Sequence, residues 1–256
     1  TTINALKVLE LAGRGDIEVA AGANRPLIRE PRVAAHVHGE SGLDGPDLPD
    51  PTNATVAQHG VDFLAEKITG ADRPITLIPT GPLTNVALLL AQHPEVAANI
   101  ERIVLMGGAI AEGNVTPAAE FNIWVDPEAA ARVFDSGVDV TMVGLDVTHR
   151  ALMTPEHADT LRAAGRVGAG VAELGAFYHR FHARVYDLPG TPVHDALAVA
   201  HVIRADLLRT ERRHVAVECA SELCRGRTVV DLWRVTGNEP NADVGVDVQG
   251  EAFLDL

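Results

Sequence analysis

Residues 75–92 have the sequence Ile75-Thr-Leu-Ile-Pro-Thr-Gly-Pro-Leu-Thr-Asn-Val-Ala-Leu-Leu-Leu-Ala-Gln92. The first four residues are apolar or β-branched and predict a buried strand, which the turn Pro79-Thr-Gly-Pro82 ends. The apolar residues after the turn predict a helix over 83–92. A buried strand followed by a short turn and an apolar helix is half of a βαβ unit, so this stretch indicates an α/β fold.

Strand-like and helical stretches alternate along the rest of the chain as well. The further predicted helices are residues 3–12, 54–69, 127–135, 155–187 and 195–203, and the further predicted strands are residues 17–21, 103–106 and 138–143. After His214, valines at alternate positions favour a small β-rich edge region near the C-terminus. We therefore expect an α/β fold in which helices flank a largely parallel, Rossmann-like central sheet, with residues 1–256 forming a single domain.

The composition excludes several classes of protein. The chain has 256 residues, of which 46% are hydrophobic, so it can bury a sizeable core. It has 21 Lys and Arg against 35 Asp and Glu, and a net charge of −14 makes nucleic acid an improbable partner. No apolar run reaches about 18 residues and no signal-like segment is present, so we expect no membrane partner. Two cysteines, Cys219 and Cys224, are too few for a disulfide framework and indicate a cytoplasmic protein.

Polar residues follow the predicted strands at the positions where α/β sheets bind their ligands. The turn that contains Thr80 directs backbone carbonyls out of the sheet, and such oxygens suit a hard cation. An ordinary strand-to-helix turn, capped by Thr84 or Asn85, explains the same residues equally well. This turn alone therefore indicates either a cation site or a helix cap.

A second polar group follows the predicted strand that ends at Met106. Glu120 and Asn122 are two residues apart, so in an extended segment both side chains face the same side. A carboxylate and an amide aimed together suit the hydroxyls of a neutral diol, and Asn114 precedes them in the same stretch. A hydrogen-bonded surface loop is the alternative interpretation.

Two further pairs of residues lie on predicted helices. His194 and Asp195 open an otherwise apolar helix, where neighbouring side chains diverge by about 100° and serve different ligands. Asp195 on its own equally suits a simple helix cap. His182 and Tyr186 are four residues apart and share a helix face, which either lines a pocket or faces solvent.

Taken in order, these motifs resemble those of the inosine–uridine preferring nucleoside hydrolases. The matching stretches are Pro79-Thr-Gly-Pro-Leu-Thr-Asn85, Val104-Leu-Met-Gly-Gly108, Gly113-Asn114, Ala119-Glu-Phe-Asn122, Asp126-Pro-Glu-Ala129 and Pro192-Val-His-Asp195. The resemblance covers essentially the whole chain. It implies an α/β enzyme of nucleoside salvage or catabolism that uses one bound Ca2+ to hydrolyse the N-glycosidic bond of purine or pyrimidine ribonucleosides. It also implies a homo-oligomer, a dimer or a tetramer.

The resemblance implies a role for each matching residue. Thr80, through its carbonyl, and Asp195, through its carboxylate, would bind the calcium, and His194 would be the catalytic residue beside the leaving base. Ribose would be held by Asn114, Glu120 and Asn122 above Met106, and the base by His36 or His38, His182 and Tyr186. The resemblance leans slightly toward pyrimidine bases.

One part of the family pattern has no counterpart in this sequence. Family members begin with a strand that ends in an Asp-rich motif of the form D-x-D-x-x-x-D-D, ahead of the segment that matches Thr1. These aspartates supply the general base and most of the calcium ligands. We therefore expect a domain truncated at its N-terminal end with an incomplete calcium site. A nucleoside- or ribose-binding module without catalysis is the alternative hypothesis, and a nucleotide-binding oxidoreductase is disfavoured because no phosphate loop is present.

Overall fold

The computed structural model describes residues 1–256 except 34–38, 40, 187 and 189, and the side chains of residues 181–186 also lie outside its description. The chain divides into two compact units. The first comprises residues 1–21, 32–59 and 152–192, and the second comprises residues 22–31, 60–151 and 193–256. A single domain over the whole chain stays a prediction.

The second unit is built on a five-stranded sheet with the strand order β1-β2-β3-β9-β6. These strands are β1 (Ile75–Leu77), β2 (Ile100–Met106), β3 (Val140–Val143), β6 (Leu208–Arg213) and β9 (Ala242–Val248). The first four in the order pair in parallel, and β6 pairs antiparallel with β9. The predicted α/β class with a largely parallel central sheet is therefore confirmed.

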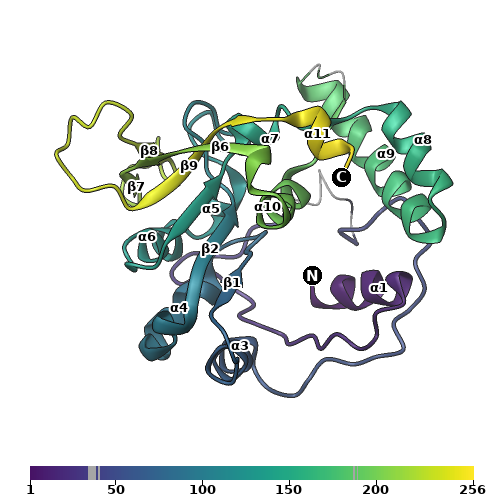
Figure 1. Cartoon of the computed structure of the whole chain (residues 1–256), viewed down its shortest axis with the longest axis horizontal. Helices are drawn as coiled ribbons and strands as arrows, with labels where there is room; N and C mark the ends of the chain where they lie inside the picture. Colours follow the sequence, from purple (N-terminus) through teal and green to yellow (C-terminus); the bar gives the residue numbers. More distant parts are fainter. Residues whose placement is uncertain (34–38, 40, 187, 189) are drawn as a thin grey trace. The chain divides into compact units, whose positions relative to one another are not determined.

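Helices cover both faces of this sheet (Figure 1). Along β2, Ile103 and Leu105 pack into one hydrophobic core, while Val104 and Met106 pack into another. The first core contains α3 (Gly60–Thr69), α4 (Thr84–Gln92), α6 (Pro127–Phe134) and the 3-10 helix η1 (Pro94–Asn99). The second contains α7 (Leu145–Thr148), α10 (His194–Ile203), η2 (Ala205–Leu207) and α11 (Gly250–Leu254). A strand that is apolar on both faces is what a sheet covered by helices on both sides requires.

The predicted β-rich region near the C-terminus is also present. Strands β7 (Val215–Val217) and β8 (Thr228–Val230) form a separate antiparallel pair. Strand β6, with the sequence Leu-Arg-Thr-Glu-Arg-Arg, was not predicted. It lies at the edge of its sheet, where charged side chains replace the apolar alternation that marks an inner strand.

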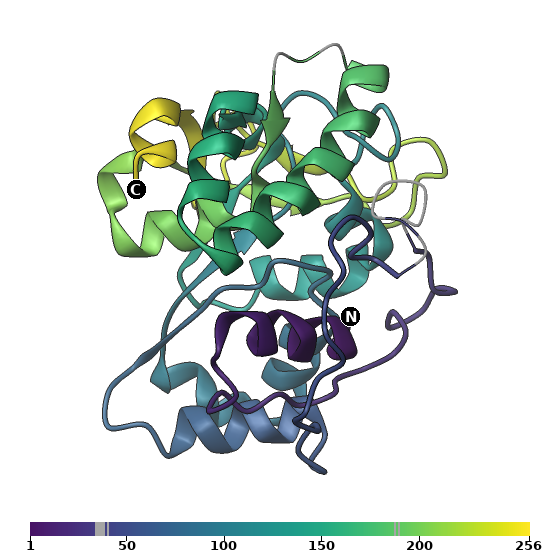
Figure 2. The same ribbon diagram turned by 90° about the vertical axis from the view of Figure 1, so that its right-hand side faces the viewer.

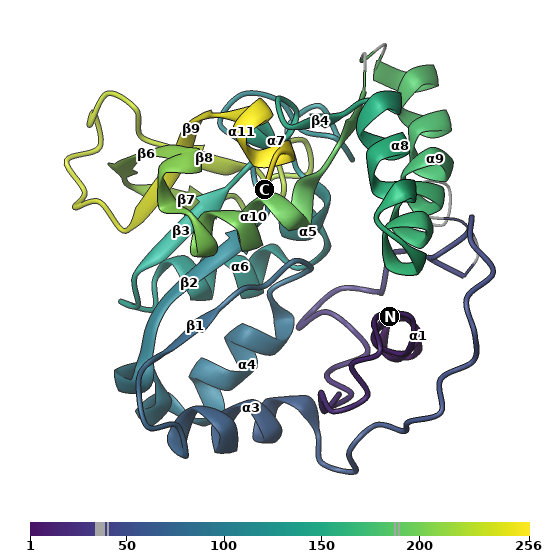
Figure 3. The ribbon, with the colours of Figure 1, turned by 45° about the vertical axis from the view of Figure 1, so that its right-hand side comes forward.

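The first unit is mainly helical. It contains α1 (Thr2–Ala12), α8 (Pro155–Ala163) and α9 (Arg166–Tyr186), together with the short antiparallel strands β4 (Leu152–Met153) and β5 (Thr191–Pro192). Helices α8 and α9 lie side by side (Figures 2 and 3). Helix α1 ends where predicted, because Gly13 takes the left-handed conformation, with φ of 67°, that closes a helix. No helix in the described ranges of either unit combines the length and the apolar character needed to cross a bilayer.

Two predicted elements near the N-terminus were wrong in extent. The helix predicted over 54–69 begins only at Gly60, because the Val56 amide donates to the Val19 carbonyl (2.9 Å) rather than within a helix. The strand predicted over 17–21 is reduced to a single bridge between Ala20 and Val56. These residues pair with each other over a long sequence separation, which local patterns do not reveal.

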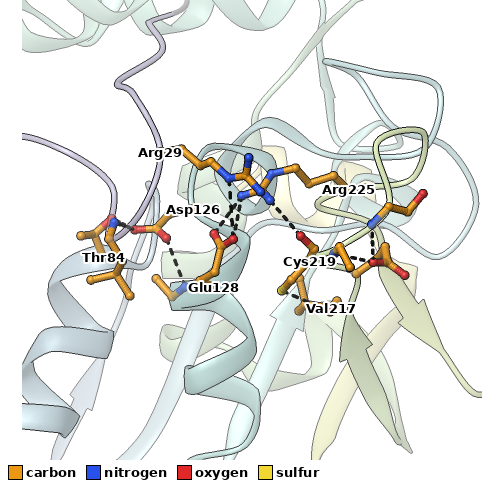
Figure 4. A network of polar contacts seen from close by, with 12 residues as sticks. Arg29, Thr84, Asp126, Glu128, Val217, Cys219 and Arg225 are labelled. Atoms are coloured by element: carbon orange, nitrogen blue, oxygen red, sulfur yellow. Dashed lines mark hydrogen bonds and ion pairs between the residues drawn. The ribbon is translucent and has the colours of Figure 1, made fainter.

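A polar network in the second unit ties four segments together (Figure 4). Arg225 donates from Nη2 to both carboxylate oxygens of Glu128 at 2.9 Å, and from Nη1 to the Cys219 carbonyl at 2.8 Å. Arg29 lies 3.8 Å from the same carboxylate. The fully buried Asp126, which caps α6, accepts from the Leu27 amide (2.9 Å) and the Thr84 hydroxyl (2.6 Å). Residues 27–29 and the loop before β8 are thus held against the N-terminus of α6.

Removing the Arg225 guanidinium should lower the free energy of unfolding. The Arg225 and Glu128 side chains are only 14% and 19% exposed, so Arg225→Ala leaves a largely desolvated carboxylate and should cost about 2 kcal/mol. Urea denaturation measures the change. The control is Arg209→Ala, because Arg209 and Glu211 are 60% and 32% exposed and their ion pair should contribute less than about 1 kcal/mol. Equal losses in the two variants would contradict this account.

Candidate functional site

The predicted site residues of the second unit follow the carboxyl ends of β1 and β2 or open α10. Thr80 follows β1, and Met106 ends β2. The connection from β2 to α6 carries Asn114, Glu120 and Asn122. His194 and Asp195 are the first residues of α10, which packs against β2. The Met106 amide donates to the Pro79 carbonyl at 2.9 Å, so the turn with Thr80 lies against the end of β2. This is where open α/β sheets bind ligands.

Glu120 is a buried capping residue. Its carboxylate accepts from the Asn122 amide (2.9 Å) and the Ile123 amide (3.2 Å), and so caps α5 (Phe121–Val125). It also accepts from the Gly108 amide at 2.9 Å, and its exposed fraction is 3%. The expectation that Glu120 and Asn122 lie in an extended segment was therefore wrong, because this capping starts a helix at Phe121.

The side-chain amides of Asn122 and Asn114 are both held by the protein backbone. Asn122 donates from Nδ2 to the Met106 carbonyl at 3.1 Å, and among the described residues its Oδ1 has no hydrogen-bond partner. The Oδ1 of Asn114 accepts from the Phe121 amide at 2.9 Å. Asn122 is half-buried and Asn114 is exposed, whereas Met106 is buried. The structure thus gives Asn122 an amide oxygen with unused accepting capacity beside Met106.

The loop after β2 is held by three side chains from other elements. Glu120 bonds Gly108, the Thr228 hydroxyl bonds both the amide and the carbonyl of Ala109, and Asp146 accepts from the next two amides. Gly108 has φ of 76°, and a Cβ there would come within 2.9 Å of Thr228. Only glycine fits at this position, which explains the second glycine of the Gly-Gly pair in the motif.

Two carboxyl groups of the site have raised pKa values. Burial raises the pKa of Glu120 to about 7, and the charge of Asp195 adds to this shift. Asp195 is exposed on one side, but surrounding protein atoms partly desolvate its carboxyl and raise its pKa to about 6. Both groups resist carrying a negative charge in this structure.

His194 is held by α7. Its Nδ1 lies 2.8 Å from the Thr148 hydroxyl, and its ring centroid lies 5.7 Å from that of His149, with 59° between the ring planes. Sequence reasoning missed Thr148 and His149. The signal was available, because they follow the carboxyl end of β3 just as Thr80 follows that of β1.

The ligands present are oxygens, the type that a hard cation prefers, but they are fewer than calcium takes. Calcium takes six to eight oxygen ligands, and the Thr80 carbonyl and the Asp195 carboxylate are oxygens of the right type. In the part of the chain that the structure describes, no three Asp, Glu, His or Cys side chains are grouped as a metal site would require. Among these residues Asp195 has no hydrogen-bond partner, so its carboxylate is available as a ligand.

Four predicted base-binding residues lie outside the described part. His36 and His38 fall within residues 34–38. His182 and Tyr186 belong to α9, but their side chains are not described. Their predicted roles remain predictions.

Comparison with known proteins gives consistent matches over essentially the whole of this chain. The model of the inosine–uridine preferring nucleoside hydrolase family matches residues 1–255. The pyrimidine-specific ribonucleoside hydrolase RihA of Shewanella woodyi is 49% identical over 258 residues, which span 100% of this chain and 83% of that protein. RihA of Shewanella sp. strain ANA-3 is 51% identical over 260 residues, which span 100% of this chain and 81% of that protein.

Two solved structures have the same fold over nearly the whole chain. A purine-preferring ribonucleoside hydrolase from Gardnerella vaginalis superposes with a TM-score of 0.92 at 32% identity, covering 99% of this chain and 82% of the other. A plant nucleoside hydrolase superposes with a TM-score of 0.90 at 32% identity, covering 99% of this chain and 83% of the other.

The raised pKa of Glu120 predicts the pH dependence of stability. The folded state binds the proton of the Glu120 carboxyl more tightly than the unfolded state does. The contribution of Glu120 to the free energy of unfolding is therefore greatest below pH 4.5, the pKa of this group in the unfolded chain, and falls as the pH rises toward about 7. The loss attributable to Glu120 is on the order of 3 kcal/mol. Glu120→Gln, which does not titrate, should flatten this part of the curve in urea denaturation with a chelator present.

Glu251→Gln, a change of an exposed carboxyl on α11, is the matched control and should keep the wild-type slope. A slope in Glu120→Gln as steep as that of the wild type would contradict the assignment to Glu120.

Proposed function

Because this chain belongs to the inosine–uridine preferring nucleoside hydrolase family, we propose that it hydrolyses the N-glycosidic bond of ribonucleosides to ribose and free base with the help of Ca2+. The observation that carries the proposal is the placement of Thr80, Asn122 and Asp195 around the carboxyl ends of β1 and β2, next to His194. Asn122 suits the hydroxyls of a diol. Thr80 and Asp195 suit a cation, and His194 suits a leaving base. The proposed location is the cytoplasm and the proposed assembly is a homo-oligomer.

The ribose would be bound by amide and carboxyl groups that the protein already fixes in place. Asn122 is oriented by its bond to the Met106 carbonyl, so its Oδ1 can accept a hydrogen bond from a ribose hydroxyl. Met106 is buried at the end of β2 and would contact the face of the sugar. Fixing the ring in this way lowers the entropy that is lost on reaching the transition state.

Loss of the base leaves positive charge on the ribosyl carbon, as in other glycoside hydrolyses. A negatively charged group nearby stabilises such a transition state, and the carboxylates of Asp195 and Glu120 are the candidates in the second unit. When bound, Ca2+ would hold the diol and an activated water. Thr80 and Asp195 are the residues of this unit that would contribute oxygens to it.

His194 would act on the leaving base. It opens α10, and the Thr148 hydroxyl lies 2.8 Å from its Nδ1, so the Nε2 side of the ring would face the base. A hydrogen bond to the departing base lowers the barrier because negative charge develops on that base as the bond breaks.

Incubation of the chain with uridine and with inosine tests this function. We expect any base release to depend on Ca2+ and to fall to background levels in a chelator. Asp195→Asn should abolish the response to Ca2+ because the variant loses a charged ligand, whereas Asp206→Asn, a change of an exposed residue in η2, should keep it. Nucleoside binding without base release would instead favour the binding-module hypothesis.

Pyrimidine nucleosides are the proposed preferred substrates. The relatives that share about half of their residues with this chain carry pyrimidine-specific names, while the purine-preferring structure is more distant. We expect kcat/KM for uridine to exceed that for inosine by about tenfold or more, the usual scale on which a pocket discriminates by fit. Equal values for the two substrates would contradict the preference without affecting the hydrolase assignment.

A further inference from the structure

The connection from β8 to β9 displays a run of apolar residues to solvent. It loops away from both strands (Figure 1), and its residues 232–239 are all exposed. Trp233 is 87% exposed, Val235 is 83% exposed and Leu232 is 39% exposed. Three exposed large apolar residues within four positions are unusual on a protein surface unless they bind something. We call residues 232–235 the tryptophan turn.

The tryptophan turn is held in one shape by Asp231. The carboxylate of this buried residue accepts hydrogen bonds from the Val235 amide at 2.9 Å and from the Thr236 amide at 2.8 Å. It also accepts from the Thr236 hydroxyl at 2.6 Å. These hydrogen bonds, that of the Thr236 hydroxyl first, lower the pKa of Asp231 to about 2, so the carboxylate stays charged near neutral pH. The apolar side chains are therefore presented on a preorganised backbone.

Arg234 lies in the middle of the turn with a strained backbone. Its φ of 56° falls in the left-handed region, and no other non-glycine residue of the described ranges has a positive φ. Glycine adopts this conformation without strain, so an arginine here points to a use for its side chain. Among the described residues the exposed Arg234 guanidinium has no hydrogen-bond or ion-pair partner. The turn thus offers an unpaired cation directly beside an exposed indole.

The charge of the turn differs from that of the chain as a whole. The chain has a net charge of −14, so most of its surface repels a second copy. Residues 232–238, with the sequence Leu-Trp-Arg-Val-Thr-Gly-Asn, contain one arginine and no acidic residue. Two copies that meet at this segment would therefore bring together their least acidic parts, which is the charge match that a contact between copies needs.

The neighbouring tryptophan and arginine are also complementary to themselves. In a two-fold symmetric contact the same surface of both copies meets, so each residue type can face the other across the axis. Arg234 would then stack on the indole of the partner's Trp233, and Trp233 on the guanidinium of the partner's Arg234. Tryptophan and arginine are the residue types that most often dominate the binding energy of interfaces.

The size of the turn suits the centre of such a contact. Its three apolar residues expose on the order of 400 Å². A stable interface buries about 800 Å² on each partner, of which the centre is apolar and the rim is polar. The exposed polar residues 236–239, which follow the turn, are available for the rim.

We propose that the tryptophan turn is the surface through which two copies of this chain bind each other, across a two-fold axis that pairs Arg234 of each copy with Trp233 of the other. This inference names the contact surface of the proposed homo-oligomer. It therefore rests on that assembly and is independent of the proposed hydrolysis.

The fluorescence of Trp233 shows whether the turn is buried when copies associate. The chain has two tryptophans, Trp124 and Trp233, so Trp124→Phe leaves Trp233 as the only one. Sedimentation velocity over a dilution series finds the concentrations at which this variant is monomeric and dimeric. We expect the emission of Trp233 to move to shorter wavelength in the dimer. An emission maximum that stays that of a fully exposed indole in the dimer would overturn the inference.

Variants of the turn measure what each side chain contributes. Trp233→Ser should raise the dissociation constant of the dimer about 30-fold or more, as truncation of a central aromatic residue does. Arg234→Gly suits the left-handed backbone but lacks the guanidinium, and should raise it about tenfold, whereas Arg234→Lys should restore much of the affinity. The matched control is Val33→Ser, because Val33 is 82% exposed outside the turn. An unchanged dissociation constant in Trp233→Ser would contradict the proposal.

Other occupants of the turn give different results. A wild type that stays monomeric over the whole dilution series would overturn the inference. So would a shift of Trp233 emission when monomeric chain meets phosphatidylserine vesicles, because the turn would then bind a membrane surface. Base release from uridine, measured on the same samples, tests hydrolysis separately. A monomer that releases base leaves hydrolysis standing without this interface, and a dimer formed through the turn that releases none leaves the interface standing without hydrolysis.

Discussion

The carboxylate of Glu120 is the contact on which the rest of the candidate site depends. It joins two segments that lie twelve residues apart, the turn at Gly108 and the first turn of α5, through three backbone amides. Without it, these amides would be buried and unsatisfied, at a cost of about 1 to 3 kcal/mol each. The same contact fixes the start of α5, and therefore the direction from which Asn122 reaches the Met106 carbonyl. One side chain thus sets both the backbone shape of the loop and the place of its polar ligand.

This arrangement extends to the residues that follow β3. The carbonyl of Gly108 accepts from Leu145, and Asp146 accepts from the amides of Ile110 and Ala111. The loop after β2 and helix α7 therefore support each other, and α7 in turn holds His194 through Thr148. A parallel sheet makes this possible because the carboxyl ends of adjacent strands lie at the same edge. The geometry of the site is set by hydrogen bonds between neighbouring strand ends more than by any single loop.

Much of the fold was predictable, and the reasons are visible in particular residues. The strands near Ile75, Ile103 and Val140 are apolar on both faces, which is a local signal, and each was predicted close to its observed position. Strand β6 lacks that signal because it is a charged edge strand. The helix predicted from residue 54 was too long because Val56 pairs with Val19, and such pairing depends on a distant segment.

The same distinction applies to the site. The sequence was enough to predict that Thr80 follows a strand and that His194 opens a helix, and the structure has both features. The capping role of Glu120 could not be predicted, because it depends on Gly108 meeting Phe121 and its neighbours in space. Thr148 follows the carboxyl end of β3, which is a local signal, but its bond to His194, 46 positions away, could not be predicted from that signal.

The electrostatics of the site would favour the proposed binding of a cation. Burial disfavours the charged forms of both Glu120 and Asp195, and the charge of Asp195 raises the pKa of Glu120 further. Near neutral pH these groups therefore carry a charge only at the expense of folding stability. A nearby cation, or the positive charge that develops on a ribosyl carbon, would favour the same carboxylates. The species that the proposed reaction creates would thus offset the cost of charging these carboxylates, which is how a site binds a transition state more tightly than a substrate.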